Sequence, residues 1–167
     1  NYRILNEKTV EKIEQKSVKT EYGKFNLILY KDLIFDETHL VLQKGKISKS
    51  SPTLVRVQQS NFFHDLLNID EYGARWSVSD SMKKINEVGK GIILLIDGEN
   101  HKQDEFNEIN ASKKRRITAP NNDPRRIGIG SQILRDLGVK KIKLMGSEVR
   151  YPSLSGFDLE VTEYVKK

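Results

Sequence analysis

The sequence contains no cysteine among its 167 residues. Disulfide bonds and zinc sites built from thiolates are therefore excluded. No apolar run approaches the roughly 20 residues that a membrane-spanning helix needs, and no signal peptide opens the chain. From these absences we expect a soluble, cytoplasmic protein that contacts no membrane.

Basic residues are in modest excess. The chain carries 29 lysines and arginines against 23 aspartates and glutamates, a formal net charge of +6. This balance suits a phosphate-bearing partner without requiring one. The length fits one domain with a sizeable core. Because the sequence begins with Asn1 rather than methionine, we expect it to be part of a longer protein.

The segment 123–145 predicts a unit of loop, helix and strand. Asp123-Pro124 and the glycines at 128 and 130 predict a tight loop. Apolar residues then recur at helical spacing over 130–137, and Gly138 stands where a helix ends in a left-handed residue. Alternation of apolar residues with lysine over 141–145 predicts a strand.

The remaining elements follow from the same rules of periodicity. Apolar runs predict further strands at 25–30, 39–44, 53–59, 91–96 and 158–165. The continuous apolar run at 91–96 fits a strand that is covered on both faces. Capping residues and apolar spacing predict a helix at 77–88, packed through Met82 and Ile85. The fold class is therefore α/β, a mixed β-sheet flanked by helices.

The segment 123–144 also carries a family resemblance. Asp-x-Arg at 123–125 is followed by Gln-Ile-Leu-Arg-Asp-Leu-Gly-Val and a Lys-Ile-Lys-Leu strand. This pattern resembles the C-terminal half of GTP cyclohydrolase II, which opens GTP in the first committed step of riboflavin synthesis. The resemblance implies a GTP cyclohydrolase II-like fold. It also implies that Asp123 occupies the position of a proton acceptor and Arg125 that of a nucleophile toward phosphate.

The N-terminal region resembles the junction of two-domain riboflavin enzymes. Asn1-Tyr-Arg and the Thr-Glu-Tyr-Gly-Lys-Phe of 20–25 have counterparts where a 3,4-dihydroxy-2-butanone 4-phosphate synthase domain ends and the cyclohydrolase domain begins. On this resemblance, residues 1–19 are a linker from a missing N-terminal domain together with the first strand. Residues 20–167 are the cyclohydrolase II-like domain. An ordinary disordered terminus explains residues 1–8 equally well.

The zinc ligands of the family are not matched. In that family three cysteines hold a zinc ion, which activates the attacking water. Counting without gaps from Arg56 places Asn61, Tyr72 and Ala74 at the three ligand positions, and none of them can act as a thiolate. The histidines do not replace them, because their spacing is not that of paired ligands: they are His39, His64 and His101. We therefore expect neither a bound metal nor another cofactor.

The nucleotide-binding segments depart from the family as well. The Arg-Gln-Glu-Gly-Arg of the family is Asp-Gly-Glu-Asn-His at 97–101 here, which keeps only Glu99. An aspartate in place of an arginine reverses the charge and weakens binding of a triphosphate. We expect Asp123 and Arg125 to be relics of the catalytic set, and Arg56, Glu99 and Arg126 to bind substrate weakly. Each has a structural alternative, such as a solvated Arg56 on one face of its strand.

Three functions from different classes remain open. The first is a degenerate GTP cyclohydrolase II-like domain, inactive toward GTP, that acts as a structural, dimerising or regulatory partner of a covalently linked synthase domain. Because the family is typically dimeric, a homodimer is expected. The second is a zinc-free hydrolase acting on a phosphorylated compound. The third is a binding module that uses residues 113–126; its basic run at 113–116 is most often a solvated loop, so we expect weak phosphate or nucleotide binding and no nucleic acid.

Overall fold

The computed structural model describes residues 8–59, 62–69, 75–96, 124–146 and 156–167, without the side chains of residues 62–63 and 124–126. The elements, in chain order, are β1 (Val10–Thr20), β2 (Gly23–Asp32), β3 (Glu37–Lys44), β4 (Thr53–Gln59), the π-helical turn η1 (Phe62–Leu66), α2 (Val78–Val88), β5 (Gly91–Ile96), α4 (Pro124–Asp136), β6 (Lys141–Met145) and β7 (Glu160–Val165). Among the described elements, the first four are strands, and the α-helices come after them.

All seven strands form one mixed sheet in the order β1-β2-β3-β5-β4-β6-β7. The pairs β1–β2, β2–β3 and β3–β5 are antiparallel, whereas β5–β4, β4–β6 and β6–β7 are parallel. The prediction of a mixed sheet flanked by helices is therefore confirmed. β1 already belongs to this sheet, while the division of the chain between residues 19 and 20 remains a prediction.

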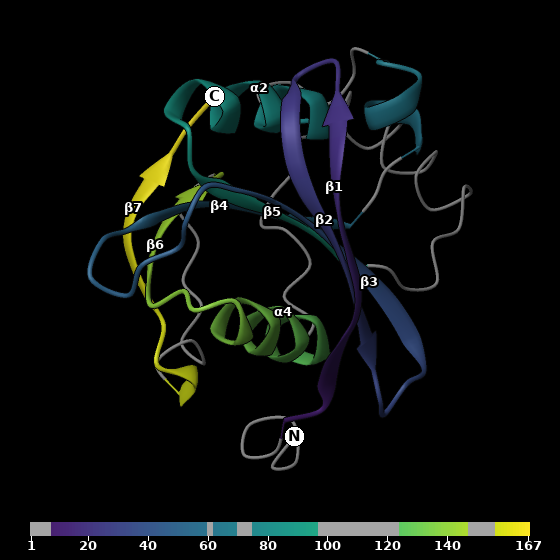
Figure 1. Ribbon diagram of the computed structural model, residues 1–167, viewed down its shortest axis with the longest axis vertical. Coiled ribbons are helices and arrows are strands. Elements are labelled where there is room, and N and C mark those ends of the chain that lie inside the picture. The colour runs from purple at the N-terminus through teal and green to yellow at the C-terminus, as the bar shows by residue number, and fades with distance from the viewer. Residues whose placement is uncertain (1–7, 60–61, 70–74, 97–123, 147–155) are drawn as a thin grey trace, which may run out of the picture.

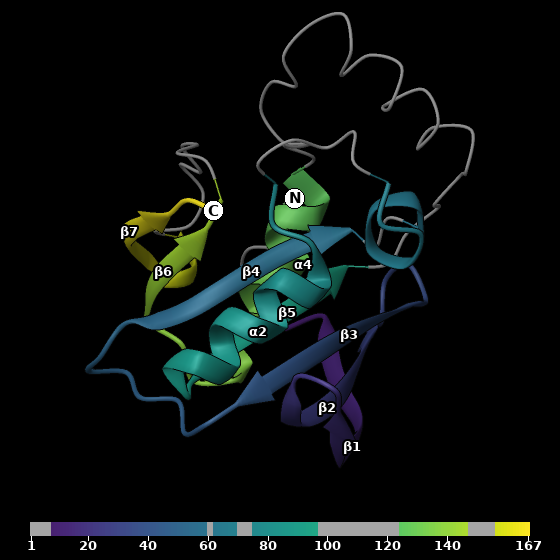
Figure 2. The same cartoon turned by 90° about the horizontal axis from the view of Figure 1, so that it is seen from above.

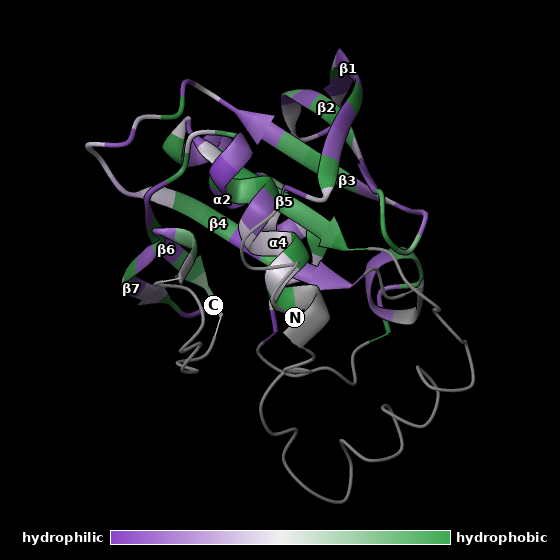
Figure 3. Ribbon diagram, turned by 90° about the horizontal axis from the view of Figure 1, so that it is seen from below, coloured by the Kyte–Doolittle hydropathy of each residue, from purple (hydrophilic) through white to green (hydrophobic). Residues whose placement is uncertain are grey.

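In the described part of the chain, α2 and α4 cover opposite faces of the sheet (Figure 1). On the α2 side, Met82 and Ile85 are buried against the sheet, as predicted. On the α4 side, Ile133 and Leu134 are buried and Leu137 is partly buried, also as predicted. β5 lies between the layers formed by α2 and α4, and Figure 3 shows it as apolar. Because both faces of this strand are covered, its sequence is an unbroken apolar run.

α2 begins after the N-cap Ser77 and ends at the C-cap Gly89. The Ser77 hydroxyl accepts a hydrogen bond of 3.1 Å from the backbone N–H of Asp80, which is the geometry of an N-cap. Gly89 has φ of 90° and donates its N–H to the Ile85 carbonyl, so the helix ends in a left-handed residue. The predicted helix at 77–88 is confirmed.

α4 begins earlier than the sequence suggested. It begins at Pro124, where a proline without an N–H is well suited to the first helical position. The tight loop predicted around the two glycines is wrong, because Gly128 and Gly130 both lie inside the helix. A Cβ on Gly130 would lie 3.2 Å from Cδ1 of Ile96. The glycine therefore serves the close approach of α4 to β5 rather than a turn.

Polar contacts attach the start of the described chain to α4. The N–H of Thr9 donates to the Gln132 side chain at 2.7 Å, and Lys8 pairs with Asp136 at 2.7 Å. The buried Tyr30 hydroxyl donates to the same carboxylate at 2.6 Å. Burial, followed by this bond, raises the pKa of Tyr30 above its ordinary value. Burial alone would raise the pKa of Asp136, but its hydrogen bonds from Lys8 and Tyr30 outweigh that effect and lower it.

Within the part of the chain that the structure describes, no helix has the length and apolar character needed to cross a membrane.

Candidate functional site

The candidate site lies at the edge of the sheet where the parallel strands end. β4, β5, β6 and β7 run parallel to one another, so their carboxyl ends meet at one edge. In α/β sheets this edge is where ligands ordinarily bind. Figure 2 shows the seven strands from above, with α2 in front of β5. The segments 60–61, 97–123 and 147–155, which follow three of these strands, lie outside the described residues.

Arg56 is the predicted site residue whose side chain the structure describes. It is partly buried on β4. Its Nη1 donates to the Met145 carbonyl at 3.1 Å, and its Nη2 donates to the Trp76 carbonyl at 2.9 Å. Its Nε donates to Oε1 of Gln58 at 2.8 Å. The guanidinium therefore joins β4 to the end of β6 and to the segment that precedes α2.

Gln58 and Asp65 extend this network to the start of α2. Nε2 of Gln58 donates to Oδ2 of Asp65 at 3.0 Å. The other carboxylate oxygen of Asp65 accepts from the backbone N–H of Val78 at 2.9 Å. This N–H belongs to the first turn of α2 and has no intrahelical partner, and a carboxylate at a helix N-terminus is stabilised by the helix dipole. Strand alternation places Arg56 and Gln58 on one face of β4, but sequence spacing gave no signal for their contacts with other elements.

His64 lies beside this network, on η1. Burial lowers its pKa most, and the neighbouring cations Lys167, Arg75 and Arg56 lower it further. The carboxylate of Asp65 acts in the opposite direction but does not outweigh them. A neutral imidazole at physiological pH follows, which suits a hydrogen-bonding role better than that of a fixed cation.

The other predicted site residues are described less completely. Arg125 and Arg126 lie in the first turn of α4, and only their backbone is described. Asp123, Glu99, His101 and the basic run 113–116 lie outside the described residues, as do Asn61, Tyr72 and Ala74. The roles predicted for all of them therefore stay predictions. Among the described residues, no group of three or more His, Asp or Glu side chains is placed to hold a metal ion.

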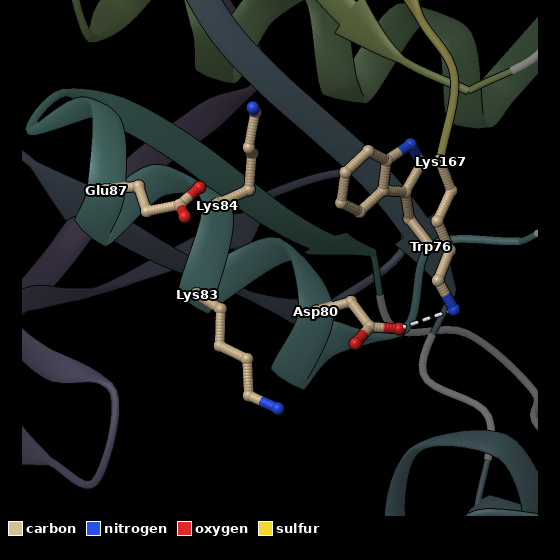
Figure 4. A pocket seen from close by; sticks show the side chains of 6 residues that line it. All are labelled: Trp76, Asp80, Lys83, Lys84, Glu87 and Lys167. Atoms are coloured by element: carbon tan, nitrogen blue, oxygen red, sulfur yellow. Dashed lines mark ion pairs between the residues drawn. The ribbon is translucent and has the colours of Figure 1, made fainter.

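A pocket of about 460 Å³ lies on the outer side of α2. Figure 4 shows the side chains that line it, which are Trp76, Asp80, Lys83, Lys84, Glu87 and Lys167. Nζ of Lys167 pairs with Oδ2 of Asp80 at 2.7 Å. Burial opposes ionisation of Asp80, but hydrogen bonds from Lys167 and Ser77 lower the pKa of its carboxyl. Three lysines face two carboxylates here, so most of the charge is neutralised and the pocket keeps a small positive excess.

Trp76 connects this pocket with the Arg56 network. Its carbonyl accepts from Arg56, and its indole Nε1 donates to the Val165 carbonyl at 3.0 Å. The side chain is 8% exposed. Trp76 therefore joins Arg56 on β4 to the end of β7, while Arg56 itself bonds the end of β6.

Comparison with known proteins places this architecture in one family. The sequence model of GTP cyclohydrolase II matches residues 11–166. A 3,4-dihydroxy-2-butanone 4-phosphate synthase of Pseudomonas aeruginosa is 40% identical over 171 residues, covering 99% of this chain and 46% of the relative. The riboflavin biosynthesis protein RibBA of Cytophaga hutchinsonii is 32% identical over 175 residues, covering 98% of this chain and 43% of the relative.

A solved structure has a similar fold. The crystal structure of RibBX, a two-domain 3,4-dihydroxy-2-butanone 4-phosphate synthase from A. baumannii, superposes with a TM-score of 0.66 at 33% identity, covering 98% of this chain and 42% of that one. The chain therefore spans less than half the length of the relatives that it matches. Because the family model spans nearly the whole chain, from β1 to the end of β7, the chain belongs to the GTP cyclohydrolase II family.

Proposed function

We propose that this chain is a GTP cyclohydrolase II-like domain that no longer acts on GTP. It serves riboflavin biosynthesis as a structural, dimerising or regulatory partner of a covalently linked 3,4-dihydroxy-2-butanone 4-phosphate synthase domain. The observation that carries the proposal is the absence of cysteine from all 167 residues. The names and lengths of the relatives support the linked synthase domain.

The zinc ion of the family does not fit the donors of this chain. The family's site needs three thiolates, and the positions reached by counting without gaps from Arg56 hold Asn61, Tyr72 and Ala74. An amide and a phenol are poor ligands for zinc, and an alanine side chain has no donor atom. No step of a GTP ring opening is therefore assigned to this chain.

The hydrogen bonds of Arg56 support a structural role for the remnant site. Three N–H groups of the guanidinium are directed to the side chain of Gln58 and to the carbonyls of Trp76 and Met145. A phosphate that bound Arg56 bidentately would have to compete with these bonds. The side chain thus stabilises the fold at the cost of affinity for a ligand.

The test is direct. The purified protein is incubated with GTP and zinc, release of formate and pyrophosphate is measured, and bound metal is quantified by elemental analysis. We expect no turnover and no stoichiometric zinc. A variant with Asn61→Cys, Tyr72→Cys and Ala74→Cys provides a matched control, because it restores three thiolates at the same positions. Zinc in the unmodified chain, or GTP turnover above background, would overturn the proposal.

The expected homodimer is tested separately. Sedimentation velocity of the natural protein should give the mass of two copies. A monomer over the full range of measurable concentrations would remove the dimerising role while leaving the loss of GTP chemistry intact.

A second candidate is a binding module, or a zinc-free hydrolase, for a phosphorylated ligand. The observation that favours it is the start of α4, where Arg125 and Arg126 lie in the first turn of a helix. Helix N-termini and arginines both favour anions. Because the family's arginines at 97 and 101 are replaced by aspartate and histidine, we expect salt-sensitive binding at roughly millimolar affinity, about 4 kcal/mol. Titrations of GTP, ATP and pyrophosphate at two salt concentrations check this. Micromolar, salt-independent binding of GTP alone would show that a nucleotide site has survived.

A further inference from the structure

The turn between β2 and β3 presents three consecutive apolar residues. Leu33 is 55% exposed and Phe35 is 45% exposed, with Ile34 partly buried between them. We call Leu33, Ile34 and Phe35 the apolar tip. Hairpin turns are ordinarily built from Gly, Pro, Asn, Asp and Ser, so a turn that exposes a leucine and a phenylalanine two residues apart is unusual. Among the described residues, Ile13 and Val88 are exposed singly and need no explanation, whereas Leu66 and Leu67 form a second exposed pair at the end of η1.

The apolar tip is held in one conformation. The fully buried Asp32 accepts hydrogen bonds through Oδ1 from the N–H of Ile34 at 2.9 Å and from the N–H of Phe35 at 3.3 Å. Asp36 has φ of 55°, and its carboxylate pairs with Lys31 at 3.0 Å. The apolar side chains are therefore presented by a turn that is already ordered, which lowers the entropic cost of binding a partner.

The apolar tip lies beside the point where the chain enters the sheet. The N–H of Leu33 donates to the carbonyl of Thr9 at 2.8 Å. Thr9 is itself buried and is fixed to α4 through Gln132. Figure 1 shows the start of β1 and the β2–β3 turn at the same end of the molecule. A domain joined ahead of residue 8 would thus leave the sheet next to the apolar tip.

We propose that the apolar tip is the docking surface for the synthase domain that is linked ahead of this chain. The inference rests on the proposed function, which supplies that domain. Three side chains are too few for a stable interface between separate proteins, which buries about 1,200–2,000 Å² in total. A covalently linked domain meets the surface at a high effective concentration, so a small apolar contact is sufficient. This difference favours the linked domain over a second copy of the chain.

The absence of cysteine provides a clean measurement. In a Phe35→Cys variant, the rate of maleimide labelling of the peptide that carries residue 35 is compared between the 167-residue chain and the natural two-domain protein. We expect a decrease of about tenfold in the two-domain protein, as for a contact that is closed about nine-tenths of the time. Val88→Cys, on α2, is the matched control and should label at the same rate in both. Leu33→Cys repeats the measurement at a second position.

A complementary variant tests the energetics of docking. Leu33→Ser with Phe35→Ser should leave the melting temperature of the 167-residue chain unchanged and increase the radius of gyration of the two-domain protein in X-ray scattering. Ile13→Ser with Val88→Ser removes as many exposed apolar side chains elsewhere and should change neither. Equal labelling of residue 35 in both proteins would overturn the docking surface and leave the proposed function standing. A natural protein without a synthase half would overturn both.

Discussion

Arg56→Ala separates a structural role of the remnant site from a ligand-binding one. The substitution removes three hydrogen bonds of 2.8–3.1 Å, and two of their acceptors are main-chain carbonyls on Met145 and Trp76. A hydrogen bond that involves a charged group contributes about 1.5–3 kcal/mol. The side chain is only partly buried, so water replaces some of these contacts, and neighbouring bonds are not additive. We therefore expect a loss of about 2–4 kcal/mol in the free energy of unfolding.

Urea denaturation with thermal melting measures this loss. The urea midpoint should decrease with little change in m, and the melting temperature should decrease by about 5–15 °C for a domain of this size. Arg135→Ala is the matched control, because Arg135 is exposed on α4, and it should cost less than about 0.5 kcal/mol. If Arg56→Ala leaves stability unchanged but abolishes the weak binding of pyrophosphate, Arg56 is a ligand-binding residue and the structural reasoning fails.

Three further substitutions test the packing and the pH dependence. Leu134→Ala, on the buried face of α4, should lower the free energy of unfolding by about 2–5 kcal/mol in urea denaturation. A loss below about 1 kcal/mol would contradict its burial. The pKa of Asp136 is lowered by hydrogen bonds that outweigh burial, so its contribution to stability is present above the unfolded pKa of about 4 and is lost as the pH falls through the folded value. Asp136→Asn should therefore make unfolding less dependent on pH below about 5, and parallel pH profiles would refute this. Gly91→Ala would place a Cβ 2.7 Å from Cγ1 of Ile85 and should cost about 1–3 kcal/mol. Gly156→Ala, whose Cβ meets no atom of the described residues within 4 Å, should be nearly neutral; equal costs would count against the packing.

Local patterns were sufficient to predict most of the sheet. The strand predicted at 141–145 matches β6 residue for residue, and the one at 91–96 matches β5. Both strands are short, and the positions of their apolar residues indicate where each strand begins and ends. The helix at 77–88 was equally accessible, because Ser77 and Gly89 supply its two boundaries within the local sequence.

α4 shows where local patterns fail. Two glycines and a proline ordinarily indicate a loop, and here all three lie in a helix. The reason is tertiary, since Gly130 allows α4 to approach Ile96 on a strand that is distant in the sequence. Propensity is overridden when a close contact between layers stabilises the helix more than the glycine weakens it.

The site was less predictable than the fold for a related reason. Arg56 was identified by its resemblance to a family position. Strand alternation places Gln58 on the same face of β4, but Met145 and Trp76 could not be inferred from spacing. Asp65 was missed altogether, although it bonds both Gln58 and the start of α2. Hydrogen bonds between elements carry no periodic signal, so only the assembled sheet reveals them.

The direction of these bonds bears on the proposed loss of GTP chemistry. Arg56 and Trp76 donate to main-chain carbonyls at the ends of β6 and β7, and Asp65 accepts from the first turn of α2. In a site kept for a ligand, such groups would be satisfied by the ligand, and its loss would leave them buried and unpaired. Here they are satisfied by the fold itself. These bonds therefore join the described ends of β4, β6 and β7 without any ligand, which agrees with the proposed structural role.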